Sequence, residues 1–296
     1  MPTPPAVPAS PASSASSASS ASSTAYPQLS SLGISVEAQV AHVQLNRPEK
    51  ANAMNRDMWS DIRRAFEWID GEPGVRVAIL SGAGAHFTSG IDLAMLAGVA
   101  DEVDDDCEGR KRESLRRVIL DLQDCLTSLE RCRTPVIAAI HGACIGGGMD
   151  LICCADMRYC AEDAFFSIKE IDMGMTADVG TLQRLPKLIG DGMTRELAYT
   201  GRKFTAAEAQ AMGLVNRVFA TPAALLAGVR EIAVGIAAKS PLSIRGTKEM
   251  LIYARDHTVA DSLNYIATWN AAMLMSADLQ EAMMSGAQKK SPRFRD

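Results

Sequence analysis

Two short segments, VRVAILSG (residues 75–82) and TPVIAAIHG (134–142), constrain the fold more than any other feature of the chain. Both are rich in valine, isoleucine and alanine and almost free of charge, which is typical of strands buried on both faces. Each runs into a glycine-bearing turn and then into a stretch with the apolar spacing of a helix. This recurrence of strand, turn and helix predicts an α/β architecture of stacked repeats.

Weaker patterns predict further strands and helices before, between and after these two segments. Residues 34–45 (ISVEAQVAHVQL) alternate as a strand does, and residues 58–70 (MWSDIRRAFEWID) have helical apolar spacing. A long helical pattern covers about 110–131, and short strands are expected at RYC and AFFSIKE. From about Thr181 onward, most of the chain is predicted to be helical.

The chain divides into three predicted parts. Residues 1–26 are dominated by Pro, Ala, Ser and Thr without a charged residue, so we expect a disordered leader. This leader lacks the basic start and apolar core of a secretory signal and the arginines of a usual mitochondrial transit peptide. Residues 27–235 form the predicted core. The apolar-patterned helices of residues 236–296 exceed what one small core requires, which predicts an oligomer.

The composition excludes several classes of protein. With 296 residues, of which 47% are hydrophobic, the chain can bury a substantial core. Its net charge of -5 gives no basic footprint, so no nucleic-acid partner is expected. It has no apolar run of about 18 residues for a membrane span, and its ending, Phe-Arg-Asp, is not a peroxisomal Ser-Lys-Leu type signal. We therefore expect a soluble intracellular protein, with cytoplasm, mitochondrion and peroxisome as open alternatives.

The cysteines and histidines give no metal-binding pattern. The seven cysteines lack a CxxC pair, and the four histidines show neither HxxxH nor HxH spacing. Several cysteines lie in apolar runs. We therefore expect reduced thiols in the core and no bound metal.

Two glycine turns suggest a site for developing negative charge. GACIGGGMD (142–150) ends a strand and begins a helix, so the amides of Gly146, Gly147 and Gly148 lie at a positive helix N-terminus. HFTSGIDL (86–93) offers a second donor, the amide of Ile91. Two amides on one carbonyl oxygen would stabilise an enolate. The alternative is that the glycines only permit tight packing of helix on strand. No dinucleotide-binding GxGxxG, phosphate loop or GxSxG elbow is present.

A third stretch, EIDMGMTADVGTLQRLP (170–186), carries acids in apolar surroundings. Glu170, Asp172 and Asp178 have only Arg184 nearby to offset them, whereas acids on a surface helix usually alternate with basic residues. The pattern indicates acids that face a pocket. The alternative is a loop with solvated carboxylates.

Three motifs in this order, NRPEKANAMN, HFTSGIDL and AAIHGACIGGGMDLICCADMRY, resemble the crotonase, or enoyl-CoA hydratase/isomerase, superfamily. The resemblance extends from about Ile34 to the C-terminus. It implies the ClpP/crotonase-like spiral of ββα repeats, followed by a helical oligomerisation region that forms a homotrimer or homohexamer. It also implies an acyl-CoA thioester substrate and no separate cofactor, since coenzyme A belongs to the substrate. The implied oxyanion hole consists of the amides of Ile91 and Gly147. The implied substrate-binding residues are Ser89, Gly90, Ile91, Asp92, Leu93 and Gly147.

Within this superfamily, the acids distinguish between activities. The positions that match the two glutamates of the hydratases are Asp150 and Glu170, and Asp178 stands where hydratases usually carry glycine. The stretches 165–190 and 240–274 are similar to the Δ3,5-Δ2,4-dienoyl-CoA isomerases of fatty acid β-oxidation.

The chemistry of such an isomerase requires two carboxyl groups set apart along the substrate. A proton leaves carbon 2 and another enters carbon 6, and one carboxylate can hardly reach both. We assign Glu170 to carbon 2, Asp178 to carbon 6 and Asp150 to orienting or tuning the pair. Asp172 is interpreted as structural, pointing away from Glu170 on an extended segment, and Asp92 as a helix cap. The alternatives are a 2-enoyl-CoA hydratase that uses Asp150 and Glu170, and a non-catalytic acyl-CoA- or RNA-binding scaffold.

We expect a chain without residues 1–26 to fold and to keep its activity, because the leader offers neither a core nor a catalytic group. Circular dichroism and turnover of the truncated and the full chain test this expectation. Unfolding, or loss of most turnover, would mean that the leader packs on the rest of the protein.

Overall fold

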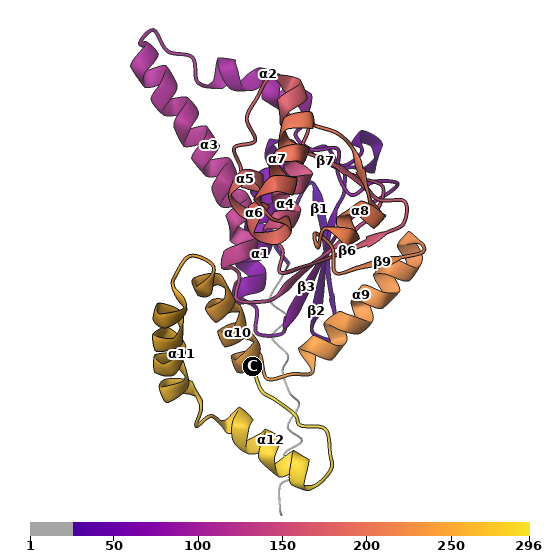
Figure 1. Cartoon of the computed structure of the whole chain (residues 1–296), viewed down its shortest axis with the longest axis vertical. Helices are drawn as coiled ribbons and strands as arrows, with labels where there is room; N and C mark the ends of the chain where they lie inside the picture. The colour runs from indigo at the N-terminus through magenta and orange to yellow at the C-terminus, as the bar shows by residue number, and fades with distance from the viewer. Residues whose placement is uncertain (1–25) are drawn as a thin grey trace, which may run out of the picture.

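The computed structural model describes residues 26–296 (Figure 1). The predicted leader lies outside these residues except for Tyr26, whose ring centroid is 5.5 Å from that of Trp68. No helix in the described part is long and apolar enough to cross a membrane. All seven cysteines are unpaired in the described residues, and six of them are buried, as the apolar runs around several of them predicted.

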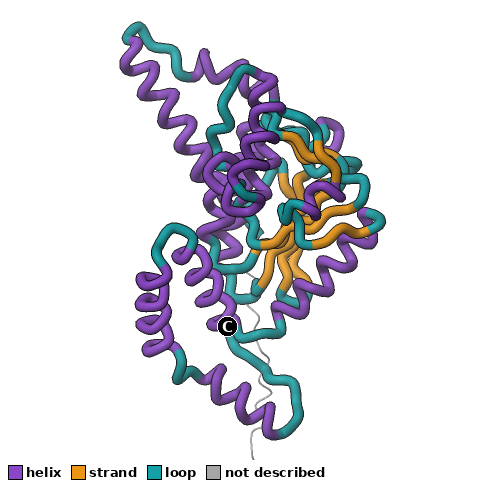
Figure 2. The backbone as a smooth tube through the Cα atoms, in the orientation of Figure 1, coloured by secondary structure: helices purple, strands orange, loops and turns teal. Residues whose placement is uncertain are grey.

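A six-stranded main sheet and a three-stranded second sheet form the centre of the molecule (Figure 2). The main sheet has the order β1 (Leu32–Glu37), β2 (Val40–Leu45), β3 (Val77–Gly82), β4 (Val136–Ile140), β6 (Met157–Ala161) and β9 (Arg217–Phe219). Within this main sheet, only the β1–β2 pair is antiparallel. The second sheet has the order β5 (Ala143–Ile145), β7 (Phe165–Ser167) and β8 (Phe204–Thr205).

The helices occupy the intervals between strands and the whole C-terminal part. Before β6 they are η1 (Pro48–Lys50), α1 (Arg56–Gly71), α2 (Leu93–Glu102), α3 (Glu108–Arg131) and α4 (Gly147–Cys153). After β7 they are η2 (Glu170–Met173), α5 (Thr181–Arg184), α6 (Pro186–Ile189), α7 (Asp191–Thr200), α8 (Ala206–Ala211), α9 (Pro222–Ala237), α10 (Pro241–Ala254), α11 (Val259–Met273) and α12 (Ala277–Ala287).

The predicted spiral of ββα repeats is confirmed. In two turns of the spiral, a strand of the main sheet is followed by a strand of the second sheet and then by a helix: β4, β5 and α4, and then β6, β7 and η2. After β3, Thr88 forms a bridge to Cys144 of β5, and α2 follows. Each turn thus brings a strand end and a helix start to the same region.

The main sheet is buried on both faces, as its apolar strands predict. On β3, Ala78 and Leu80 join a core that includes α1 and α3, whereas Val77 and Ile79 pack on the side covered by α9. The alternation of side chains along a strand sends neighbouring residues into the two cores.

Residues 34–45, predicted as one strand, belong to a hairpin. Ala38 (φ 49°) and Gln39 (φ 63°) form its two-residue turn, and Leu32 pairs with Leu45. Such turns usually carry Asn-Gly or Asp-Gly, so this sequence gives no turn signal. The helix α2 and the short strands β8 and β9 were also not predicted.

Helices α10, α11 and α12 form an arm that extends from the sheet-containing body (Figure 1). The buried ammonium of Lys248 ties α10 to the body: it donates to the carbonyl oxygens of Leu129 and Thr134, both at 3.2 Å, and to the carboxylate of Asp156 at 2.8 Å. We call these three helices the C-terminal arm.

Candidate active site

Two glycine-bearing turns meet beside the second sheet. Gly90 (φ 92°) and Gly146 (φ 54°) adopt left-handed backbone angles that favour glycine. A Cβ atom on Gly90 would lie 2.6 Å from the carbonyl oxygen of Ile145, so a side chain would not fit there. A Cβ atom on Gly147 would lie 3.7 Å from the amide nitrogen of Ile91. The contact therefore brings the amides of Ile91 and Gly147 close together.

These two amides, of Ile91 and Gly147, donate to no atom of the described part of the chain. The amides around them are paired: that of Met54 donates to the carbonyl oxygen of Gly90 at 2.8 Å, and that of Asp92 to the carbonyl oxygen of Met54 at 3.1 Å. These two adjacent amides are free in a backbone that is otherwise paired, so both can donate hydrogen bonds to the oxygen of a ligand.

The last glycine of the motif serves packing instead. A Cβ atom on Gly148 would lie 2.6 Å from Cγ2 of Thr88 and 3.3 Å from Sγ of Cys144. The packing alternative thus holds for Gly148, whereas Gly147 presents a free amide.

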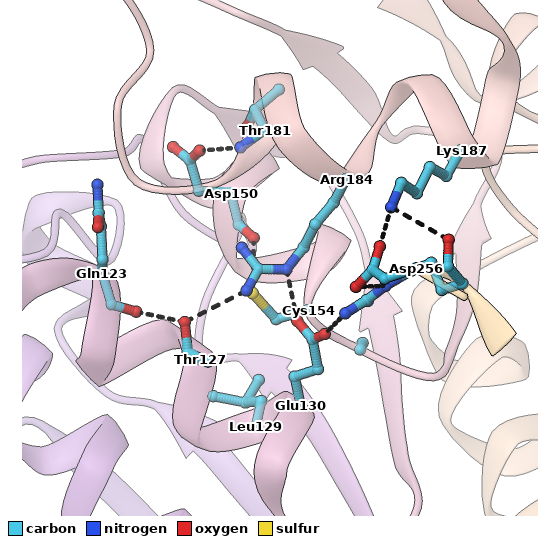
Figure 3. A network of polar contacts seen from close by, with 12 residues as sticks. Gln123, Thr127, Leu129, Glu130, Asp150, Cys154, Thr181, Arg184, Lys187 and Asp256 are labelled. Atoms are coloured by element: carbon cyan, nitrogen blue, oxygen red, sulfur yellow. Dashed lines mark hydrogen bonds and ion pairs between the residues drawn. The ribbon is translucent and has the colours of Figure 1, made fainter. Parts of the chain in front are cut away.

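Asp150 is fully buried one helical turn after Gly146. Its Oδ1 accepts a hydrogen bond from the amide of Thr181 at 2.6 Å (Figure 3), and its Oδ2 has no partner in the described structure. Burial raises the pKa of Asp150 to about 6, against the opposing effect of the hydrogen bonds from Thr181. The charge of Asp178 raises this pKa further, and that of Arg184 lowers it.

Glu170 begins η2 and reaches the first glycine of the helix start. Its Oε1 lies 3.3 Å from the position that a Cβ atom on Gly146 would take. Its Oε2 is buried without a partner among the described residues. Burial, followed by the charge of Asp150, raises the pKa of Glu170 to about 7.

Asp178 is the most open of the three acids. Its residue is exposed, and its carbonyl oxygen accepts a hydrogen bond from Nε2 of Gln123 at 2.6 Å. Partial desolvation nevertheless raises the pKa of its carboxyl. The charge of Asp178 acts on both Asp150 and Glu170. The structure thus gathers the three predicted catalytic acids into one cluster.

The two acids interpreted as structural have structural partners. Asp172 pairs with Lys169, but it lies on a 3-10 helix rather than on the expected extended segment. The predicted cap is confirmed: Asp92 accepts from the amide of Ala94 at 3.0 Å and pairs with Arg47 at 3.0 Å. Its carboxylate is therefore already engaged within the protein.

Two further predicted substrate-binding residues flank the free amide. The amide of Ser89 donates to the carbonyl oxygen of Ala51 at 2.9 Å, and the side chain of Leu93 is 62% exposed at the start of α2. Their contact with substrate stays a prediction.

Sequence reasoning did not identify Thr181 or Glu130. The amide of Thr181 begins α5 directly after Gly180 (φ 137°), so a helix start after a glycine was the available signal. Arg184, expected to offset the nearby acids, forms its salt bridge with Glu130 at 2.6 Å. Glu130 is distant in sequence, and nothing in its own segment pointed to this pairing.

The profile of the enoyl-CoA hydratase/isomerase family matches residues 35–296. The chain therefore belongs to this family, as its three motifs predicted.

The relatives and solved structures that this chain resembles agree with that assignment. The peroxisomal Δ(3,5)-Δ(2,4)-dienoyl-CoA isomerase of Arabidopsis thaliana is 48% identical over 271 residues, which cover 91% of this chain and 98% of that protein. The mitochondrial enzyme of that name from Homo sapiens is 47% identical over 257 residues, covering 86% of this chain and 78% of that one. The crystal structure of an enoyl-CoA hydratase from Bacillus anthracis superposes with a TM-score of 0.82 at 29% identity, covering 90% and 99% of the two chains.

The buried carboxyl of Asp150 predicts a pH-dependent stability. A carboxyl whose pKa is raised by folding binds its proton more tightly in the folded protein, so stability falls as pH rises through that pKa. We expect Asp150→Asn, which is uncharged and of similar shape, to raise the free energy of unfolding. The gain should be larger at pH 8 than at pH 5 by about 1 kcal/mol, because the pKa of Asp150 is about 6.

Denaturant unfolding of both proteins at the two pH values measures this difference. An equal gain at both values, or a loss of stability at pH 8, would contradict the assignment.

Proposed function

We propose that the protein is a Δ(3,5)-Δ(2,4)-dienoyl-CoA isomerase of fatty acid β-oxidation. The observation that carries the proposal is the cluster of Glu170, Asp178 and Asp150 beside the free amides of Ile91 and Gly147. The names of relatives at 47% to 48% identity support the same activity.

In the proposed reaction, the amides of Ile91 and Gly147 donate to the thioester carbonyl oxygen of the substrate. Their hydrogen bonds strengthen as negative charge develops on that oxygen, which stabilises the enolate more than the substrate. The raised pKa of Glu170, about 7, suits a base that works near neutral pH.

Two proton transfers complete the isomerisation. Glu170 removes a proton from carbon 2, and the electron pair of that C–H bond enters an enolate whose negative charge rests on the thioester oxygen. That pair then returns to form the double bond between carbons 2 and 3. The pair of the old 3,4 double bond moves to carbons 4 and 5, and the pair of the old 5,6 double bond takes a proton from Asp178 at carbon 6. The reaction neither gains nor loses electrons, so it requires no redox cofactor.

Asp150 acts on this pair through its charge. It does not need to touch the substrate, because an ionised Asp150 raises the pKa of Glu170 from within the helix. This fits the predicted role of orienting or tuning the two acids.

Two alternatives are tested by the same substrates. A 2-enoyl-CoA hydratase would use Asp150 and Glu170 to hold water, and a scaffold would turn over nothing. Incubation with 3,5-dienoyl-CoA should produce the absorbance of a conjugated dienoyl thioester. With 2-enoyl-CoA, a hydratase would instead remove the enone absorbance, and no change with either substrate would favour the scaffold.

The C-terminal arm supports the further proposal that the protein is a homotrimer or homohexamer. The arm exposes large apolar side chains that the described residues leave uncovered. They are Leu251, Val259, Leu263, Met275, Met283 and Met284, with exposed fractions from 56% to 84%. A surface of this kind is typical of an interface.

We expect light scattering at micromolar concentration to give the mass of three or six chains, because burial of these side chains favours association. Leu263→Glu would place a charge in the interface and should lower that mass. A single-chain mass for the unaltered protein would refute the proposed assembly.

The division of work between the two acids predicts different losses in two variants. Asp178→Asn keeps the shape of the side chain but cannot transfer a proton, so turnover should fall by roughly a hundredfold or more. Substrate binding should change little. Because Glu170 and the two amides remain, the variant should still incorporate deuterium at carbon 2 in D2O.

The matched variant Glu170→Gln should lose both isomerisation and exchange at carbon 2. Mass spectrometry of the recovered substrate measures the exchange, and absorbance measures the product. Near-normal isomerisation by Asp178→Asn would refute the two-acid mechanism and favour the hydratase.

A further inference from the structure

Arg184 packs closely against the backbone of Gly180, two residues after Asp178. It is the last residue of α5, and a Cβ atom on Gly180 would collide with its guanidinium. Its side chain is largely buried, and its Nη2 donates to Oγ1 of Thr127 at 3.2 Å. Arg184 is therefore packed against the backbone that joins Asp178 to Thr181.

Glu130 holds this arginine with one carboxylate oxygen and a second arginine with the other. Its Oε2 accepts from Nε of Arg184 at 2.6 Å, and its Oε1 pairs with Nη2 of Arg255 (Figure 3 shows this network). Although burial opposes ionisation, the hydrogen bonds from Arg255 and Arg184 lower the pKa of Glu130. The three side chains form a charged bridge between α3, α5 and the end of α10.

The Glu130–Arg184 pair of this bridge is more buried than the neighbouring ion pair between Lys187 and Asp256. The side chains of Glu130 and Arg184 are only 10% and 15% exposed, whereas those of Lys187 and Asp256 are 44% and 52% exposed. A solvated pair contributes little to holding a segment in place, but a buried pair is costly to break. The Glu130–Arg184 pair is thus the better-buried ionic contact at this junction, and Arg255, whose side chain is 31% exposed, joins it to the end of α10.

We propose that the Arg255–Glu130–Arg184 bridge is a positioning device for the catalytic acids, through which the C-terminal arm fixes the start of α5. The inference rests on the proposed function. By holding Arg184, the bridge keeps Asp178 at its place and the amide of Thr181 on Asp150.

The two acids depend on this bridge unequally. Glu170 lies on η2, next to Gly146, whose amide donates to the carbonyl oxygen of Ser167 at 2.9 Å. These contacts lie outside the bridge. Loss of the bridge should therefore impair the proton transfer of Asp178 more than that of Glu170, whereas a merely structural role would impair both alike.

The experiment compares exchange at carbon 2 in D2O with isomerisation of 3,5-dienoyl-CoA. In Glu130→Gln, we expect turnover to fall about tenfold, because a small displacement of a catalytic group is expensive. Exchange should fall less, so the ratio of exchange to isomerisation should rise at least about threefold, with KM nearly unchanged. Arg255→Met should raise this ratio less than Glu130→Gln does. Arg255→Lys, which keeps the charge, should restore most of the ratio of the unaltered protein.

The matched control is Arg131→Met. Arg131 follows Glu130 in sequence and pairs with Asp124 at the surface, outside the bridge. The ratio of exchange to isomerisation in Arg131→Met should equal that of the unaltered protein. If Glu130→Gln does not fold, Arg255→Met decides the question. The side chain of Arg255 is 31% exposed at the end of α10, so the fold should tolerate its replacement better.

The outcomes separate the two proposals. If the unaltered protein does not isomerise the substrate, the proposed function fails. If it isomerises, but Glu130→Gln and Arg255→Met keep its ratio of exchange to isomerisation, the bridge is only structural and the inference fails, whatever their melting temperatures.

Discussion

The candidate site depends on the backbone contact between the two glycine turns, and Thr88 organises that contact. The amide of Thr88 donates to the carbonyl oxygen of Ala143 at 2.9 Å, and its own carbonyl oxygen accepts from the amide of Ile145 at 3.2 Å. Its hydroxyl accepts from the amide of Gly90 at 3.1 Å. These bonds fix the Gly90 turn against the end of β5. Since α4 begins right after β5, the free amides of Ile91 and Gly147 are held in place before any ligand binds.

The acids beside this contact, Asp150 and Glu170, lack within the described residues the salt-bridge partners that a buried structural acid usually has. Glu130 is buried too, but two arginines neutralise it. Asp150 is fully buried and Glu170 is half-buried, each has one buried oxygen without a partner in the described structure, and the charge of Asp150 raises the pKa of Glu170. Burial of carboxyls without a salt-bridge partner costs stability, and such perturbed carboxyls are concentrated at functional sites. The contrast within one chain argues that the cluster is kept for chemistry.

The sequence predicted the structure best where one physical requirement determines a local pattern of residues. The strands β3 and β4 were predicted because burial on both faces requires continuous apolar runs, and the free amides because glycine permits close backbone approach. The helix α2 was missed because it has no buried residue and so no one-sided pattern. The pairing of Arg184 with Glu130 joins distant segments, and no local pattern encodes which distant partner a side chain will meet.

The difference in exposure between Glu170 and Asp178 has a mechanistic meaning under the proposed reaction. Glu170 is half-buried with its Oε2 enclosed by the protein, and this burial raises the pKa of Glu170 before any substrate binds. Asp178 is an exposed residue, so water still reaches its carboxyl, although partial desolvation already raises the pKa of this group. An acyl chain lying over Asp178 would exclude that water and favour the protonated carboxyl. Binding of the substrate would thus favour the protonated form of Asp178, which must deliver a proton to carbon 6. The pKa of Glu170, the base at carbon 2, is already raised in the free protein.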